Sequence, residues 1–300
     1  MRTIYHKPVM LEEAIQGLKI DPDGVYVDVT YGGGGHSTVL LQNLSDRGRL
    51  IAFDQDAAAH ENSISDERFQ LIDGNFSHLK RHLKFCGITK VDGILADFGV
   101  SSHQFDSGSR GFSTRLEGPL DMRMNNQAGF TAREVINGYS AEELQQIFKD
   151  YGELRIARKL ANHIVKAREE NPIETTQELV RLLTPILPKY VFNKIIAQVF
   201  QAIRIEVNAE LEVIKSFLEQ SVDLLKIGGR LACISYHSLE DRLVKVFIRE
   251  GKFVGKAESD LYGNRYLPLK KVGNLQIPSD EEIKENSRAR SGKLRIAERI

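Results

Sequence analysis

The stretch Val25-Tyr-Val-Asp-Val-Thr-Tyr-Gly-Gly-Gly-Gly-His-Ser37 decides the fold of this chain. Its β-branched run leads into four glycines, and apolar residues at helical spacing follow at Val39, Leu40, Leu41 and Leu44. This order predicts a strand, a glycine loop and the start of a helix, which together open a βαβ unit. Glycines allow positive φ and close approach of a ligand to the peptide atoms, and the helix start offers free N–H groups. The stretch therefore predicts a ligand site at the end of the first strand.

Two acidic residues indicate which ligand this loop binds. Asp28 ends the first strand, and Asp54 ends the second, 20 residues after Gly34. A carboxylate at Asp54 can bind ribose hydroxyls, and one at Asp28 can face an ammonium group. A dinucleotide fingerprint needs a third glycine where Ser37 stands. The residues favour S-adenosylmethionine over NAD, although an NAD-dependent oxidoreductase and a purely structural glycine turn stay open.

The composition excludes several classes of protein. The chain has 300 residues, 41% of them hydrophobic and 27% charged, which is ordinary for a soluble globular protein. Its 41 basic and 41 acidic residues cancel, so a nucleic-acid partner must be bound by a local patch. Cys86 and Cys233 lack metal-ligand spacing, so we expect no metal site and no disulfide framework. Without a signal-peptide core or an apolar run of roughly 18 residues, we expect a cytoplasmic protein with no membrane contact.

Short apolar runs separated by helical patterns continue along the chain. We expect strands at Val25–Val29, Leu50–Phe53, Phe69–Ile72, Val91–Ala96 and Arg230–Ser235, with two closing strands at Tyr266–Val272 and Lys293–Ala297. The alternation over the first four of these strands predicts a parallel, doubly wound sheet with its ligand at the carboxyl ends of the strands.

A long interruption separates the fourth strand from the fifth. Residues 99–130 are rich in glycine and resemble a functional loop, and residues 131–205 show only helical patterns. Ser140 and Thr175 each begin a capping box, and Asn208 is expected to cap the helix with which the α/β pattern resumes. We therefore expect a discontinuous α/β domain of residues 1–104 and 206–300, interrupted by an inserted helical domain of residues 105–205.

Seven motifs together resemble one known family. They are DVTYGGGGHS (28–37), DFGVSS (97–102), RGFS (110–113), GPLDMRM (118–124), FQAIR (200–204), SYHSLEDR (235–242) and NSRARS (286–291). In this combination the chain resembles the small-subunit ribosomal RNA methyltransferase H family (MraW/RsmH type), which methylates N4 of a cytidine in 16S rRNA. The resemblance runs from residue 6 to the C-terminus, and departs at Ser287, where the family usually has proline.

The resemblance implies a fold, a cofactor and a partner. The fold would be a Rossmann-like class I S-adenosylmethionine-dependent methyltransferase sheet of the α/β class, with the inserted all-helical domain recognising the substrate. The cofactor would be S-adenosyl-L-methionine, without a metal, and the partner 16S rRNA within the small ribosomal subunit. The positions corresponding to the family's cofactor-binding residues are Gly34, Gly35, His36, Asp54, Phe76, Asp97 and Gln104.

Methylation of a cytosine amine makes a specific demand on the protein. The amine delocalises its lone pair into the ring, so an acceptor for its protons would stabilise the charge that develops on nitrogen. Asp97 follows the fourth strand and is the candidate acceptor, with Ser101 or Ser102 orienting the base. The alternative is that Asp97 is a helix cap or a salt-bridged strand-end acid. The prolines that many amino-methylating enzymes carry at this point are absent.

A second group of candidates follows the fifth strand. His237 can contact the flipped base or accept a proton, and Tyr236 can stack on that base; a structural role for His237 stays equally open. Glu240, Asp241 and Arg242 are more typical of a charged helix start.

Basic residues in two segments are candidates for RNA contact. Arg110, Arg115 and Arg123 lie in the glycine-rich loop, and Arg288, Arg290, Lys293 and Arg295 lie near the C-terminus. Such charges are often only a solvated surface, and binding of phosphates by them would make the affinity depend on salt.

Other functions stay compatible with the sequence. The chain could methylate DNA, another RNA or a small-molecule amine, or act as a non-catalytic ribosome assembly factor that binds the cofactor and RNA. The oligomeric state is open, and a homodimer is possible.

Overall fold

The computed structural model describes residues 8–127 and 129–300, except for the side chain of Ser102. The chain divides into two compact units, Met1–Gly99 with Leu211–Ile300 and Val100–Glu210. We call them the α/β unit and the helical unit. At each border the helical unit is five residues longer than the inserted domain expected from sequence, which spans residues 105–205.

The described residues of the α/β unit form a seven-stranded sheet in the order β3-β2-β1-β4-β5-β7-β6. The strands are β1 Val25–Asp28, β2 Arg49–Asp54, β3 Phe69–Asp73, β4 Val91–Asp97, β5 Leu225–Ser235, β6 Leu269–Gln276 and β7 Lys293–Arg299. The first five are parallel, whereas β7 pairs antiparallel with both β5 and β6. The order reverses between β1 and β4, and ligands of such sheets bind beyond the strand ends at this reversal.

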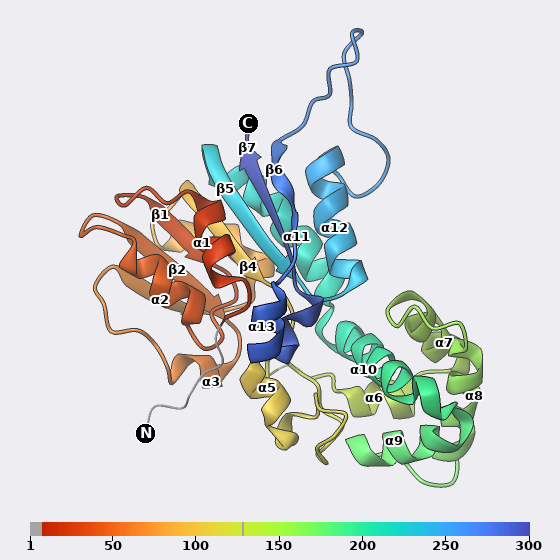
Figure 1. The fold of residues 1–300 in the computed structure, drawn as a ribbon. Helices are drawn as coiled ribbons and strands as arrows, with labels where there is room; N and C mark the ends of the chain where they lie inside the picture. The colour runs from red at the N-terminus through yellow and green to blue at the C-terminus, as the bar shows by residue number, and fades with distance from the viewer. Residues whose placement is uncertain (1–7, 128) are drawn as a thin grey trace. The chain divides into compact units, whose positions relative to one another are not determined.

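Helices cover both faces of this sheet (Figure 1). The helices of this unit are α1 Leu11–Leu18, α2 Gly35–Gln42, α3 Ala57–His60, α4 Leu79–Phe85, α11 Glu210–Leu224, α12 Ser238–Glu250 and α13 Asp280–Glu285, and α13 lies beyond the strand ends rather than over a face. Neighbouring residues of β4 belong to different cores: Ile94 lies in the core that includes Phe217 of α11, and Leu95 in the core that includes Leu40 of α2. Because successive side chains of a strand alternate between faces, an apolar run such as that of β4 fits burial on both sides.

The helical unit has its own apolar core, built from residues between Val100 and Val207. Its helices are α5 Ser102–Asp106, α6 Ala132–Gly138, α7 Ala141–Asp150, α8 Ala157–Arg168, α9 Thr176–Leu183 and α10 Phe192–Asn208. The two expected capping boxes are confirmed: Ser140 Oγ accepts from the Glu143 N–H (3.2 Å) and Thr175 Oγ1 from the Glu178 N–H (3.2 Å). In the described parts of the chain, no helix combines the length and apolar character needed to cross a membrane.

The capping role expected of Asn208 is wrong. Asn208 is the last residue of α10, and its side chain binds the loop before α6 instead. Its Oδ1 accepts from the Met124 N–H (2.7 Å), and its Nδ2 donates to the Met122 carbonyl (2.8 Å). The asparagine therefore fixes the glycine-rich segment to α10.

Candidate active site

The glycine loop between β1 and α2 is shaped for close backbone approach. Gly32 and Gly34 have positive φ angles of 53° and 75°, and the Gly34 N–H closes a turn on the Tyr31 carbonyl (2.8 Å). A Cβ on Gly34 would lie 2.6 Å from the Tyr31 hydroxyl, and one on Gly35 would lie 2.2 Å from Pro8 Cγ. Only glycine fits at position 34 without strain, because both its conformation and its space exclude a side chain.

Asp28 fixes this loop from the protein interior. Its side chain is buried, with Oδ2 accepting from the Ser37 hydroxyl (2.7 Å) and Oδ1 from the Thr30 N–H (3.1 Å). Burial raises the pKa of Asp28. Both oxygens are thus occupied inside the protein, and we assign Asp28 to bracing the loop rather than to facing an ammonium group. Ser37, whose hydroxyl binds Asp28, stands at the position that the third glycine takes in a dinucleotide fingerprint.

Asp54, at the end of β2, is aimed at the same loop. Its Oδ2 accepts from the Gly32 N–H (2.8 Å) and its Oδ1 from the Asp56 N–H (2.9 Å). Burial raises the pKa of Asp54 to about 6. Each carboxylate oxygen can accept more than one hydrogen bond, so Asp54 fits hydroxyl donors such as those of a ribose. Carboxylates beside an open glycine backbone suit a neutral sugar and a cationic amino-acid group better than a pyrophosphate, so the residues present fit S-adenosylmethionine.

Asp97 ends β4, next to the loop, and three groups fix it. Its N–H donates to Thr30 Oγ1 (2.7 Å), and its Oδ1 accepts from the Tyr236 hydroxyl (2.7 Å). Its Oδ2 lies 3.8 Å from His36 Nδ1, and its side chain keeps 22% exposure. Burial raises the pKa of Asp97 to about 6, against the opposing effect of His36. The carboxylate is therefore held at a defined place with part of its surface open.

His36 is oriented by the segment before α1. Its Nε2 lies 3.1 Å from the Val9 carbonyl, which can only accept, so Nε2 carries a proton. Nδ1 is left facing Asp97, and a protonated imidazole there favours an ionised Asp97.

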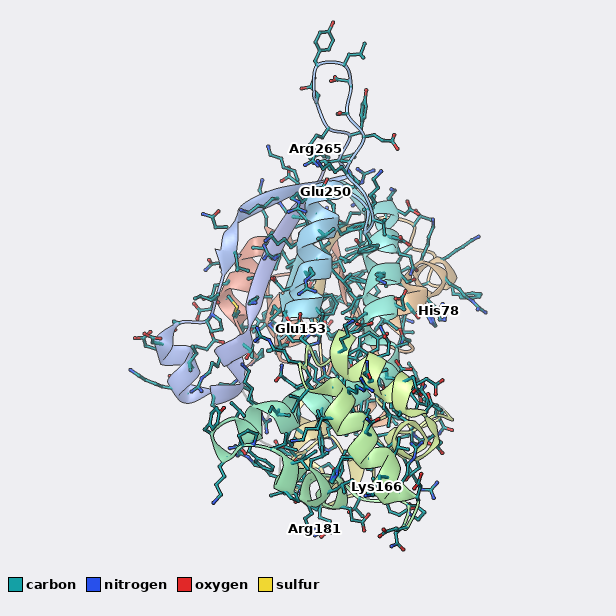
Figure 2. The ribbon with its side chains drawn as sticks, turned by 90° about the vertical axis from the view of Figure 1, so that its right-hand side faces the viewer. His78, Glu153, Lys166, Arg181, Glu250 and Arg265 are labelled. Carbon is teal, nitrogen blue, oxygen red and sulfur yellow. The ribbon has the colours of Figure 1, made fainter. Side chains whose placement is uncertain are left out.

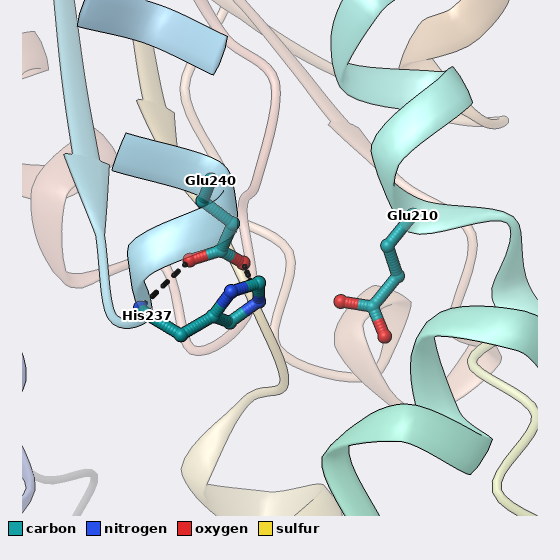
Figure 3. A group of neighbouring side chains, drawn as sticks. All are labelled: Glu210, His237 and Glu240. Carbon is teal, nitrogen blue, oxygen red and sulfur yellow. Dashed lines mark hydrogen bonds and ion pairs between the residues drawn. The ribbon is translucent and has the colours of Figure 1, made fainter. Parts of the chain in front are cut away.

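The turn after β5 is built on a buried glutamate (Figure 3). Glu240 Oε2 accepts from the Tyr236 N–H (2.8 Å) and the His237 N–H (3.3 Å), and Oε1 lies 3.1 Å from His237 Nε2. Glu240 is fully buried at the start of α12. The structure therefore brings Tyr236 to Asp97 and pairs the His237 imidazole with Glu240. Glu240 does belong to a helix start, as expected, but it is not a solvated charge.

Phe76 follows β3 in a short 3₁₀ turn, Phe76–His78. Its ring packs with Phe98 (centroids 6.3 Å apart) and edge-on with Phe217 (5.6 Å), and it stays half-buried. The two roles weighed for Phe76, core residue and adenine contact, are therefore compatible: the ring has both packing partners and an open part.

Ser101 and Gln104 lie in the helical unit and satisfy each other. Ser101 Oγ accepts from the Gln104 N–H (3.3 Å), and Gln104 Oε1 accepts from the Ser101 N–H (3.0 Å), which caps α5. This hydroxyl serves a helix start, which speaks against an orienting role for Ser101. The side chain of Ser102 lies outside the described residues.

The arginines proposed to contact RNA differ in their surroundings. Arg110 is buried and donates to the carbonyls of Arg123 (3.0 Å) and Met124 (3.1 Å), so burial argues against direct contact with RNA. Arg123 forms a two-bond ion pair with Asp121 (2.9 and 2.7 Å). Arg115 and Arg290 are exposed, and Arg288 is half-buried.

The near-terminal cations also differ from what the sequence suggested. Arg295 is bound to Asp241 of α12 (2.7 Å), and Lys293 lies 4.0 Å from the same carboxylate. Asp241 therefore holds β7 to the start of α12.

Sequence reasoning missed the bracing residues of this site, Thr30, Ser37 and Glu240. Thr30 lies in the quoted motif, and its hydroxyl two residues after a strand-end acid was a usable signal. Its bond to Asp97, 67 residues away, was not, because it depends on which strands become neighbours.

Comparison with known proteins gives one consistent family. A family model described as "MraW methylase family" matches residues 3–300. The chain is 58% identical to the ribosomal RNA small subunit methyltransferase H of Christiangramia forsetii, over 99% of this chain and 98% of that protein. It is 57% identical to the protein of the same name from Flavobacterium johnsoniae, again over 99% and 98%. A weaker similarity links it to the structure of an rRNA methylase from Streptococcus thermophilus, with a TM-score of 0.41 and 13% identity over 99% of each chain. With residues 3–300 matched by the family model and 99% of the chain aligned with a relative at 58% identity, this chain belongs to the MraW methylase family.

Proposed function

We propose that this protein transfers a methyl group from S-adenosylmethionine to the exocyclic N4 amine of a cytidine in 16S rRNA of the small ribosomal subunit. The relatives are named as small-subunit ribosomal RNA methyltransferases. The observation that carries the proposal is the placement of Asp97 beside the glycine loop, fixed by Thr30, Tyr236 and His36 and still partly open.

The cofactor site is proposed at the carboxyl ends of β1, β2 and β4. Its residues in the α/β unit would be Gly34, Gly35, His36, Asp54, Phe76 and Asp97. Asp54 would accept from the ribose hydroxyls and the glycine backbone would admit the amino-acid end. When bound, S-adenosylmethionine supplies an electrophilic methyl group on its sulfonium.

Asp97 has the central chemical role in this proposal. The Tyr236 hydroxyl occupies Oδ1, so Oδ2 is the oxygen left to accept from the target amine. An ionised carboxylate there increases electron density on nitrogen and stabilises the positive charge that develops as the new C–N bond forms. The surplus amine proton then passes to Asp97 or to solvent; the His36 imidazole beside Asp97 opposes the effect of burial, which raises the pKa of this carboxyl group.

Tyr236, His237 and the arginines complete the proposed substrate site. The Tyr236 ring, oriented by its bond to Asp97, would stack on the extruded base. His237 would contact the base as a partner oriented by Glu240. Arg288 and Arg290 would contact phosphates, and the helical unit, with Arg115, would recognise the surrounding RNA. Arg110 is omitted because it is buried, and Arg123 because Asp121 pairs with it.

The decisive experiment incubates the protein with radiolabelled S-adenosylmethionine and either naked 16S rRNA or small-subunit particles, and then maps the modified nucleotide. We expect one N4-methylated cytidine. Methylation of a different acceptor would contradict the substrate, and binding of cofactor and RNA without transfer would identify an assembly factor instead. The mass of the purified protein in solution tests whether it forms a homodimer.

A further inference from the structure

A hairpin between α12 and β6 carries apolar side chains that the α/β unit does not pack. Within residues 251–268, Leu261 is fully exposed, Tyr262 is 91% exposed and Tyr266 is 68% exposed. Figures 1 and 2 show the hairpin projecting from the unit. Large exposed side chains gathered in this way mark a surface for interaction.

The tip of the hairpin is nevertheless ordered. The Tyr266 N–H donates to the Glu258 carbonyl (2.8 Å), and the Asp260 N–H donates to the Asn264 carbonyl (2.9 Å). The Asp260 carboxylate accepts from the N–H groups of Tyr262 (2.9 Å) and Asn264 (2.8 Å). These bonds close the turn and present both tyrosines without help from the rest of the unit.

The base of the hairpin is fixed to the end of α12. The buried Glu250 accepts from the Ala257 N–H (3.0 Å), from Arg249 Nε (2.7 Å) and from Arg265 (Figure 2). The Phe253 ring stacks on Phe247 of α12, with centroids 4.9 Å apart. A hairpin anchored in this way holds its tip at a fixed distance from the helix.

Four lysines flank this base. Lys252 and Lys256 follow α12, and Lys270 and Lys271 open β6, the edge strand of the sheet. Within the described part of the chain, Lys252, Lys256 and Lys270 form no ion pair, whereas Glu250 is already bound to two arginines. The hairpin therefore combines unpaired cations with exposed aromatic rings, the combination that binds single-stranded nucleic acid. A purely apolar partner would leave these lysines without counter-charges.

The hairpin lies far from the methyl-transfer site of the same unit. The 13-residue α12 begins after the carboxyl end of β5 and ends at the hairpin, so its axis separates the two by about 20 Å. A single nucleotide cannot contact both places, but a long RNA can.

We propose that the hairpin is a second RNA-binding element, in which Tyr262 and Tyr266 stack on unpaired bases while Lys252, Lys256 and Lys270 contact phosphates. The inference rests on the proposed function for its RNA substrate and adds a contact remote from the target base. It predicts that the hairpin acts on RNA affinity and leaves the chemical step unchanged.

The test compares two double variants that separate stacking from apolar burial. Tyr262→Phe with Tyr266→Phe keeps both rings, whereas Tyr262→Leu with Tyr266→Leu keeps apolar surface and loses the rings. We measure binding to a fluorescent oligo(U) and to 16S rRNA, and KM and kcat for methylation of small-subunit particles. Phe85→Leu, at another exposed aromatic of the same unit (79% exposed), is the matched control.

We expect the leucine pair to weaken oligo(U) binding at least about tenfold, since each stacked base contributes roughly 1–3 kcal/mol, and to raise KM for the particle at unchanged kcat. The phenylalanine pair and the Phe85 variant should stay within about twofold of wild type. We also replace the three lysines by glutamine. The slope of the logarithm of the RNA-binding constant against the logarithm of the salt concentration should then be less steep by about two.

Unchanged oligo(U) binding by the leucine pair would overturn the inference. A second result would also overturn it: the leucine pair is fully active on particles, but a variant with both tyrosines changed to aspartate loses that activity. This result would identify an apolar protein contact. If wild-type protein methylates no particle, the proposed function fails separately, and oligo(U) binding still decides whether the hairpin binds RNA.

Discussion

Asp97 is held by contacts that come from two segments of the α/β unit, the loop and helix start of residues 30–36 and the turn after β5. Thr30 fixes its backbone, Tyr236 occupies one oxygen, and His36 faces the other. Burial disfavours the charged form, and the neighbouring imidazole favours it. The protein thus keeps a carboxylate near its titration point at the place where we expect an amine to become cationic.

Replacement of Asp97 by asparagine should reduce kcat for methyl transfer by about 10²–10³-fold, the loss typical of removing one preorganised electrostatic contact. The amide has nearly the same shape but no charge. The measurement is single-turnover transfer to small-subunit particles, with Glu219→Gln, an exposed acid on α11, as the control. A rate within twofold of wild type would rule out the role of Asp97.

The rate should also depend on pH through the same carboxylate. The pKa of Asp97 is raised to about 6, and the ionised form is the one that accepts from the amine. At saturating cofactor, kcat should therefore fall as the pH decreases below 6 and level off above pH about 7. The Asp97→Asn variant should lack this fall of kcat at low pH. A wild-type kcat that is constant from about pH 5 to 8 would contradict the assignment.

The individual bonds of the site were beyond sequence reasoning, although most of its positions were not. Asp54, His36 and Asp97 follow from motif and strand-end placement. That Asp28 binds Ser37, and that His237 lies against Glu240, depends on side-chain geometry that a one-dimensional pattern does not contain. Ser101 shows how one short motif supports two interpretations, since the residues that suggest catalysis also form a helix cap.

At the scale of helices and strands, the sequence predicted the elements best where the local pattern of residues was strong. The strands β1 to β4 lie within about one residue of their expected ends, because β-branched and apolar runs bounded by Gly and Asp are unambiguous. Strand β5 begins earlier than expected, at Leu225, and its pairing with β4 is irregular between Val91 and Gly93. The antiparallel direction of β7 was not predicted, because the residues of one strand do not determine whether its neighbour runs parallel or antiparallel.

The loop before α2 allows a prediction about cofactor binding. Gly34→Ala places a Cβ 2.6 Å from the Tyr31 hydroxyl in a backbone with φ of 75°. We expect at least about tenfold weaker binding of S-adenosylmethionine by calorimetry, because the loop must move to relieve the clash and strain. Gly129→Ala, where a Cβ would meet nothing within 4 Å, is the control, and equal affinity of the two variants would show that the loop does not form the cofactor site.

Helix caps give a prediction about stability. Ser140→Ala removes the acceptor for the Glu143 N–H at the start of α7 and should cost about 1 kcal/mol, seen as a fall of a few degrees in the melting temperature. Ser140→Asp keeps an acceptor and should restore most of the loss. A melting temperature unchanged by the alanine would mean that this cap does not stabilise the protein.

On the scale of the whole molecule, the helical unit should be able to fold alone. Its core is formed by residues between Val100 and Val207, and its length of 111 residues, from 100 to 210, is within the usual range for independent domains. We expect a fragment of residues 100–210 to show a helical circular dichroism spectrum and a cooperative thermal transition. A spectrum without helix, or a transition without cooperativity, would show that the unit depends on the rest of the chain.

The point at which the helical unit interrupts the sheet has a consequence for biosynthesis. Strand β4 is made before the insertion, and β5, which pairs with it, is made only after residue 224. At about 5–20 residues per second, a nascent chain waits on the order of ten seconds with the β5-facing edge of β4 uncovered, while the helices between them emerge and pack. Slow translation of this segment would prolong that exposure, so the yield of native enzyme should respond to codon choice and chaperone supply most strongly there.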